Sequence, residues 1–159
     1  MTWYDLSLTL APGVAVYPGD PPYRCESLRA VDPKHRASFR VSALSLGSHS
    51  GTHVDAPAHF VSGGPCVAAI AVERLCGAAK LCDLSHANVR IERGDLEALP
   101  LQGVRRLLLR TRQSARPWSA PGPEDAHLSA PAATYLRELG VGLVGIDSAS
   151  VDAVDSVDF

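Results

Sequence analysis

The stretch SAPAATYLRELGVGLVGID, residues 129–147, decides the fold, because a capped helix in it runs directly into an apolar strand. Ser129 is a typical N-cap residue, Pro131 suits the first helical turn, and Gly140 is a typical residue to end a helix. VGLVGID (141–147) then has the apolar character of a buried strand. A helix that leads straight into a buried strand is typical of an α/β domain.

The segments before this stretch continue the alternation of strands and helices. AAKLCDL (78–84) and VRRLLLRT (104–111) are predicted as strands, and the run of leucines in the second suggests burial on both faces. Between them GDLEALP (94–100) predicts a short helix with Asp95 as its N-terminal acid. SARPWSAPGPEDA (114–126) holds three prolines and a glycine, which predicts a long surface loop.

The first half of the chain is richer in strands than in helices. DLSLTL (5–10) and SFRVSALSLG (38–47) alternate polar and apolar residues and are predicted as strands. VYPGDPPY (16–23) predicts a turn, and SGGP (62–65) ends the next segment. We therefore predict a single α/β domain over residues 1–159, with a mixed sheet and flanking helices.

Composition narrows the class of partner. The chain has 159 residues, 46% apolar and 20% charged, which fits one ordinary globular domain. Its net charge is -2 without a basic block, so nucleic acid and membrane surfaces are not expected partners. The N-terminus lacks the pattern of a signal peptide, and the four cysteines form no CxxC pair. We expect a cytoplasmic protein with free thiols.

HSGTHVDAPAHF, residues 49–60, concentrates three of the six histidines and one aspartate. A metal site, a catalytic dyad and a histidine-rich turn are the three interpretations. His49 and His53 are four apart, as in zincin helices, but the intervening SGT contains glycine and lacks the glutamate. His53 and Asp55 are two apart and share a face of an extended segment. Imidazole and carboxylate suit a divalent ion such as zinc or manganese, so we favour a metal site with His49, His53 and Asp55 as ligands.

His59 has a different predicted role. It follows the three ligands closely, and an unperturbed histidine titrates near neutral pH. That property suits a general acid/base beside a metal-bound water, whose pKa the ion lowers. The pattern therefore indicates metal-assisted hydrolysis.

The histidine segment resembles the HxGTHxDxPxHF signature of the cyclase family, which includes the bacterial kynurenine formamidases. Four further blocks resemble family blocks in the same order and extend the resemblance over nearly the whole chain. They are YPGD (17–20), GVRRLLLRT (103–111), AHLSAPAATYLRELGV (126–141) and GIDSASVDAVDS (145–156). The resemblance implies a swivelling β/β/α domain, usually assembled as a homodimer.

The same resemblance implies the chemistry and its residues. His49, His53 and Asp55 would bind zinc, with Asp55 bridging two ions, and His59 would donate and accept the proton. Tyr17 falls where the family places an aromatic residue that lines the substrate pocket. The implied reaction is hydrolysis of an aryl formamide, such as N-formylkynurenine in tryptophan catabolism, to formate and an arylamine.

The resemblance also implies an incomplete site. Family chains carry a histidine and then a glutamate after the GIDSASVDAVDS block, and this sequence ends at Phe159 before either. We therefore expect a domain that lacks its C-terminal part, either as a fragment of a hydrolase or as a natural short form. The alternatives are a non-catalytic or truncated metal-binding relative, and a lactam-opening hydrolase of the isatin type.

Other acidic residues and histidines are not expected to complete the site. Three of the four aspartates at and after the last predicted strand resemble ordinary turn residues, and the two remaining histidines of the second half are predicted at the surface. These residues are Asp147, Asp152, Asp155, Asp158, His86 and His127.

Overall fold

The structure is a computed structural model that describes residues 4–35, 38–119, 121–154 and 156. The chain divides into two compact units, residues 1–55 and residues 56–159. The boundary between the units falls inside the histidine segment. That the whole chain acts as one domain stays a prediction.

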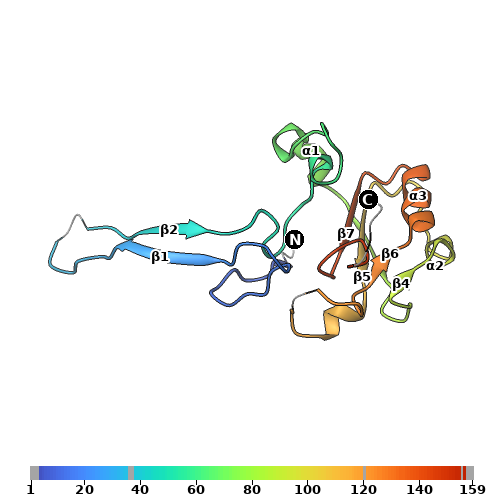
Figure 1. The fold of residues 1–159 in the computed structure, drawn as a ribbon. Helices are drawn as coiled ribbons and strands as arrows, with labels where there is room; N and C mark the ends of the chain where they lie inside the picture. The colour runs from blue at the N-terminus through green and yellow to red at the C-terminus, as the bar shows by residue number, and fades with distance from the viewer. Residues whose placement is uncertain (1–3, 36–37, 120, 155, 157–159) are drawn as a thin grey trace. The chain divides into compact units, whose positions relative to one another are not determined.

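The first unit contains a two-stranded antiparallel ribbon. β1 (Arg24–Arg29) pairs with β2 (Val41–Ser45), and a register shift between Ser27 and Arg29 marks a β-bulge (Figure 1). Every residue of both strands is exposed. β2 confirms the strand predicted within residues 38–47, whereas nothing in the sequence analysis predicted β1.

The prediction of a strand at DLSLTL is wrong. Residues 5–10 form no strand, because side chains rather than a neighbouring strand satisfy the backbone there. The amide of Ser7 donates to Asp5 Oδ1 at 2.9 Å, and the amide of Leu8 donates to Thr52 Oγ1 at 2.9 Å. Aspartate and threonine commonly offer the backbone this alternative to a ladder.

The second unit is built on a parallel three-stranded sheet. Its strand order is β3 (Lys80–Asp83), β5 (Arg106–Arg110), β7 (Leu143–Ile146). A second parallel pair joins β4 (Arg90–Ile91) to β6 (His127–Leu128) (Figure 1). Parallel strands need crossover connections, and α2 (Arg93–Glu97) and α3 (Ala130–Glu138) lie in them.

The two predicted helices are present, and α3 begins and ends at its predicted signals. α3 (Ala130–Glu138) starts where Ser129 Oγ accepts the amide of Ala132 at 3.3 Å, and Gly140 beyond its end has a φ of 77°. α2 (Arg93–Glu97) starts with a capping box in which Asp95 is the N-terminal acid. The shorter elements are α1 (Val72–Leu75) and the 3-10 turns η1 (Pro57–His59), η2 (Val67–Ala69) and η3 (Arg112–Ala115).

The core of the second unit lies between the sheet and α2 and α3. Leu107 and Leu109 of β5 are fully buried and Leu108 is half-buried, as the leucine run predicted. β3 differs from its prediction, because Leu81 is 62% exposed while Cys82 is buried. The remaining buried apolar residues of this core are Leu84, Ala87, Ile91, Leu96, Leu101, Ala126, Ala132 and Leu136.

The predicted α/β class is confirmed. Parallel and antiparallel pairings both occur, although they lie in separate sheets. Among the described residues, no helix combines the length and apolarity that crossing a bilayer requires.

Candidate metal centre

The histidine segment starts where β2 ends, and tight turns shape it. The amide of Ser50 donates to the carbonyl of Gly47 at 3.2 Å. Gly51 follows with a φ of 66°, and a Cβ at this position would lie 2.7 Å from Leu10 Cδ2. Glycine therefore meets two demands here, a left-handed backbone and the close approach of Leu10. This turn folds the segment back on itself.

The structure brings His49, His53 and Asp55 together. His49 Nδ1 lies 2.7 Å from Asp55 Oδ1, and His53 Nε2 lies 3.3 Å from the same oxygen. The two ring nitrogens are 3.2 Å apart, and the rings meet edge to face with centroids 5.0 Å apart. All three side chains are partly exposed, so the cluster is open to small solutes.

A backbone contact sets the tautomer of His53. Its Nδ1 lies 2.8 Å from the carbonyl oxygen of Gly51, which can only accept a hydrogen bond. Nδ1 therefore carries the proton and donates, and Nε2 of the neutral ring presents its lone pair to Asp55 and His49. Metal-binding histidines are commonly oriented by such a contact on the second ring nitrogen.

These donor atoms fit a divalent ion. In a tetrahedral site with bonds of about 2.0–2.1 Å, ligand atoms stand about 3.4 Å apart. The separations of 2.7 to 3.3 Å are close to that spacing. A lone pair of His53 also faces a carboxylate oxygen, which is unfavourable unless a cation or a proton lies between them. The chemistry and spacing of the donors thus support the predicted ligand set.

Ser50 is a feature of this turn that the sequence analysis did not single out. It is buried, and its Oγ has no hydrogen-bond partner among the described residues. Buried hydroxyls are usually paired, so an unpaired one beside the histidines marks an unusual polar environment. A serine between a histidine and a glycine gives no signal of burial, which is why the sequence could not reveal it.

His59 lies near the start of the second unit, as the last residue of η1. Its amide donates to the carbonyl of Ala56 at 2.9 Å, and its ring lies 4.2 Å from the ring of Phe60. The predicted SGGP turn packs closely against the start of η1. A Cβ at Gly64 would lie 2.9 Å from the carbonyl carbon of Pro57. The structure therefore gives His59 a defined backbone, and its catalytic role stays a prediction.

Tyr17 lies in the first unit at the predicted PGD turn. The amide of Asp20 donates to the Tyr17 carbonyl at 3.0 Å, and Gly19 has a φ of 96°. The turn itself is therefore confirmed. The tyrosine is 39% exposed, and its contact with a substrate stays a prediction.

Asp147 holds a loop of the second unit in place. Its carboxylate accepts hydrogen bonds from the amide of Thr111 at 2.9 Å, the Thr111 hydroxyl at 2.7 Å and the amide of Ser114 at 3.1 Å. The Ser114 hydroxyl also donates to it. Asp147 follows β7 and Thr111 follows β5, so the parallel strands bring them to the same edge of the sheet. The Asp147 carboxylate thus accepts hydrogen bonds from both Thr111 and Ser114. That Asp147 does not bind metal stays a prediction.

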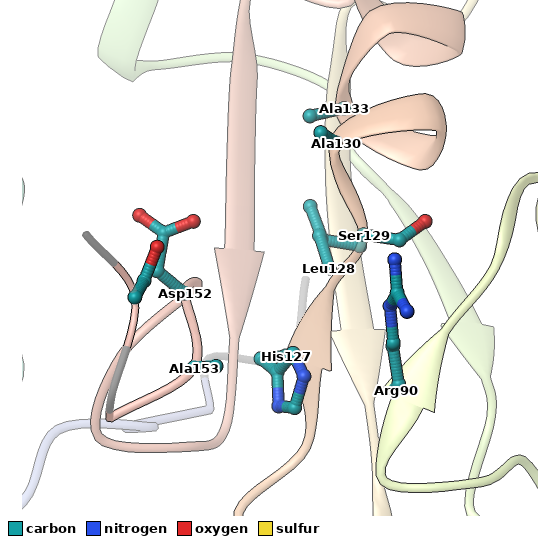
Figure 2. Close-up of a pocket in the computed structure, with 9 residues that line it drawn as sticks. Arg90, His127, Leu128, Ser129, Ala130, Ala133, Asp152 and Ala153 are labelled. Atoms are coloured by element: carbon teal, nitrogen blue, oxygen red, sulfur yellow. The ribbon is translucent and has the colours of Figure 1, made fainter. Parts of the chain in front are cut away.

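A cavity of about 350 Å³ lies elsewhere in the second unit, beside β4, β6 and the start of α3. Arg90, His127, Ser129 and Asp152 (Figure 2), together with Ser156, supply its polar lining. Burial raises the pKa of Asp152, and the neighbouring His127 lowers it to a smaller extent. His127 is half-buried rather than at the surface as predicted, because the short strand β6 carries it into the fold. None of the predicted site residues lines this cavity.

His86 is exposed, as predicted. Asp155 and Asp158 lie outside the described residues.

Comparison with known proteins places the chain in a family. The cyclase family model matches residues 4–153. The chain belongs to the cyclase family. A kynurenine formamidase of Bacillus cereus is 37% identical over 153 residues, covering 96% of this chain and 71% of the relative. A kynurenine formamidase of Maricaulis maris is 32% identical over 151 residues, covering 94% of this chain and 70% of the relative.

Three solved structures resemble the chain in fold. A potential metal-dependent hydrolase with cyclase activity has a TM-score of 0.78 and 29% identity, covering 96% of this chain and 71% of that one. A predicted metal-dependent hydrolase from Bacillus stearothermophilus gives 0.77 and 29%, covering 97% and 72%. An isatin hydrolase gives 0.79 at 20% identity, covering 94% and 68%, which shows a shared fold alone.

Proposed function

We propose that this cyclase-family chain is a metal-dependent hydrolase of an amide C–N bond, acting on an aryl formamide such as N-formylkynurenine. The observation that carries the proposal is the convergence of His49, His53 and Asp55 at 2.7 to 3.3 Å. The kynurenine formamidases at 32% to 37% identity favour the formamide as substrate. The products are formate and a free arylamine, as in tryptophan catabolism.

The ligands of the proposed ion are His49 Nδ1, His53 Nε2 and Asp55 Oδ1. Asp55 would also hold a second ion, as the family resemblance implies. Zinc is the favoured metal and manganese the alternative, because both accept imidazole and carboxylate donors. A divalent ion bound there supplies a Lewis acid for the amide carbonyl and activates water near neutral pH.

The chain's own residues position the substrate and move the proton. His59 is the proposed general acid/base, which takes a proton from the attacking water and passes it to the leaving amine nitrogen. The Gly51 carbonyl keeps the His53 ring in one tautomer and orientation. Tyr17 is the proposed aromatic wall for the substrate ring.

The proposed setting is a cytoplasmic homodimer with a small-molecule substrate. The net charge of -2 and the absence of a basic block in the sequence support the expectation that nucleic acid is not a partner. The homodimer rests on the family resemblance.

Lactam opening of the isatin type is the first alternative to formamide hydrolysis. The 20% identity of the isatin hydrolase supports the common fold and no shared substrate, so we rank lactam opening below formamide hydrolysis. A non-catalytic metal-binding relative is the second rival. It shares the three ligands and differs only in turnover.

The test combines metal analysis with turnover. The purified chain loaded with zinc should release formate from N-formylkynurenine and leave isatin unchanged. His59→Ala should lower kcat by about 10²–10⁴-fold with its metal content retained, as expected for the loss of a general acid/base. His86→Ala is the matched control, since His86 is an exposed histidine of the same unit. Loss of metal from the His59 variant would instead make His59 a ligand, and a metal-loaded chain without turnover would support the non-catalytic alternative.

A further inference from the structure

The cavity beside β4, β6 and the start of α3 has a volume that suits a small molecule. Its 350 Å³ falls at the lower end of the range that ligand-binding cavities span. All of its described lining residues belong to the second unit. Small side chains leave this space open, and together with one leucine they give it an apolar wall of Leu128, Ala130, Ala133 and Ala153.

One side of the cavity presents hydrogen-bond acceptors without donors. The Asp152 carboxylate makes no hydrogen bond or ion pair with any described residue, although burial raises its pKa. His127 Nδ1 lies 3.1 Å from the carbonyl oxygen of Asp125, so Nδ1 donates and Nε2 of the neutral ring carries a lone pair. A charged His127 lowers the pKa of Asp152, which places the two groups within electrostatic reach of each other. Two such acceptors together favour a ligand that donates hydrogen bonds.

The other side of the cavity presents donors. Ser129 is 3% exposed, and its Oγ accepts a helix amide, which leaves its hydroxyl proton for another acceptor. The amide of Ala130 begins α3, and the first amides of a helix have no acceptor within it. Arg90 Nε pairs with Glu92 at 3.2 Å, and its terminal nitrogens contact no acceptor in the described ranges. Figure 2 shows the Arg90 side chain extending toward Ser129, with Asp152 across the cavity.

We propose that this cavity binds a small α-amino acid with an apolar side chain. The ammonium group, which has three N–H donors, lies between Asp152 and His127 Nε2. The carboxylate lies against Ser129, Arg90 and the positive end of α3. The side chain contacts Leu128 and the alanines of the apolar wall.

The presence of both charges in the cavity decides between ligand classes. A simple anion supplies no donor for Asp152 and is repelled by its carboxylate, whereas a simple cation supplies no acceptor for Arg90. A zwitterion satisfies both sides. None of the proposed metal ligands or catalytic residues lines this cavity, so the inference does not depend on the proposed hydrolytic activity.

Isothermal titration calorimetry of the full chain with L-leucine tests the charge requirement. Isoamylamine is leucine without its carboxylate, and isocaproate is leucine without its ammonium group. At about pH 8, where an ordinary histidine is neutral, L-leucine should bind at least about tenfold more tightly than either analogue. An analogue that binds as tightly as L-leucine, or no binding of L-leucine at about 10 mM, would overturn the proposal.

Substitutions of the two charged residues test the site itself. Asp152→Asn and Arg90→Gln should each weaken L-leucine binding by at least about tenfold, because each removes one charged partner. Asp83→Asn and Arg110→Gln are the matched controls, since Asp83 and Arg110 form an exposed ion pair in the same unit. The controls should keep the parental affinity. Equal weakening by the controls, or parental affinity in either cavity variant, would contradict the assigned site.

A steric variant supplies a measurement that leaves the charges in place. Ala133→Leu should weaken L-leucine binding by at least about tenfold, because the larger side chain fills part of the cavity. Thr134→Leu is the matched control, since Thr134 is the next exposed residue of α3 and is not among the described lining residues. Circular dichroism checks that both variants keep their helices. Parental affinity in Ala133→Leu would place the amino acid elsewhere on the chain.

Discussion

Gly51 determines the path of the backbone between the two predicted ligands His49 and His53. Its φ of 66° is a conformation that L side chains adopt at a cost, and a Cβ would meet Leu10 at 2.7 Å. Gly51→Ala should therefore lower the free energy of unfolding by more than the roughly 1–2 kcal/mol of the backbone effect alone. Gly13→Ala is the control, because Gly13 has a φ of 87° and open space around its Cβ position. Chemical denaturation that gave equal losses for both variants would contradict the steric account.

Asp55 contacts both histidines through one oxygen, so its removal should affect the metal most directly. Asp55→Asn should reduce zinc affinity by at least about tenfold, because an uncharged amide is a poor substitute for a carboxylate ligand. Asp32→Asn is the matched control, since Asp32 pairs with His35 at 2.6 Å in the same unit, and among the described residues the two belong to no cluster of metal-binding side chains. Titration with a competing chelator measures both variants. Equal affinities would remove Asp55 from the ligand set.

The closeness of the three predicted ligands could be predicted from the sequence, whereas the geometry of their contacts could not. The spacing of His49, His53 and Asp55 is short enough for a local turn to bring them together. The tautomer of His53 depends on the carbonyl of Gly51, and the burial of Ser50 depends on the path of the turn. Both depend on the path of the backbone through the turn, which the spacing of side chains in the sequence does not determine.

At the scale of elements, Asp147 joins β7 to the loop that follows β5. Asp147→Ala should lower the free energy of unfolding by about 2–3 kcal/mol, because amides and hydroxyls of Thr111 and Ser114 would lose a charged acceptor. Asp83→Ala is the control. Asp83 also ends a strand of this sheet, but its contacts with Ser85 and Arg110 are exposed, so its loss should be clearly smaller. Comparable losses in urea denaturation would argue against a special role for Asp147.

The turn after β7 carries a pH-dependent contribution from Asp152. Its pKa is raised by burial, so the folded protein binds this proton more readily than the unfolded chain does. The stability linked to that proton is fully present below the ordinary carboxyl pKa and is lost as pH rises through the raised value. Asp152→Asn should therefore raise Tm at about pH 7 relative to the parent, with the difference shrinking toward about pH 4. A difference that does not change with pH would assign the effect to packing.

Elements with strong local signals were predictable and weakly patterned ones were not. α3 has Ser129, Pro131 and Gly140 as start and stop signals, and the structure confirms each. β1 reads RCESLR, which shows no steady alternation because its bulge breaks the period. β4 and β6 are two residues long, too short for periodicity, and DLSLTL alternates without having a strand to pair with.

At the scale of the whole molecule, the family resemblance predicted membership of a family, which hydrophobic periodicity alone could not. The five motif blocks led to the cyclase family, and the match over residues 4–153 confirms it. The division into two units between Asp55 and Ala56 was not predictable, because the break falls inside the continuous motif HSGTHVDAPAHF.

The central claim is that this chain hydrolyses an aryl formamide with an ion held by His49, His53 and Asp55. The most direct measurement is formate release from N-formylkynurenine by the zinc-loaded chain, with Asp55→Asn and Asp32→Asn assayed beside it. The account predicts turnover for the parent and Asp32→Asn, and its loss in Asp55→Asn together with the bound metal. Stoichiometric zinc on the parent chain without any release of formate would contradict it.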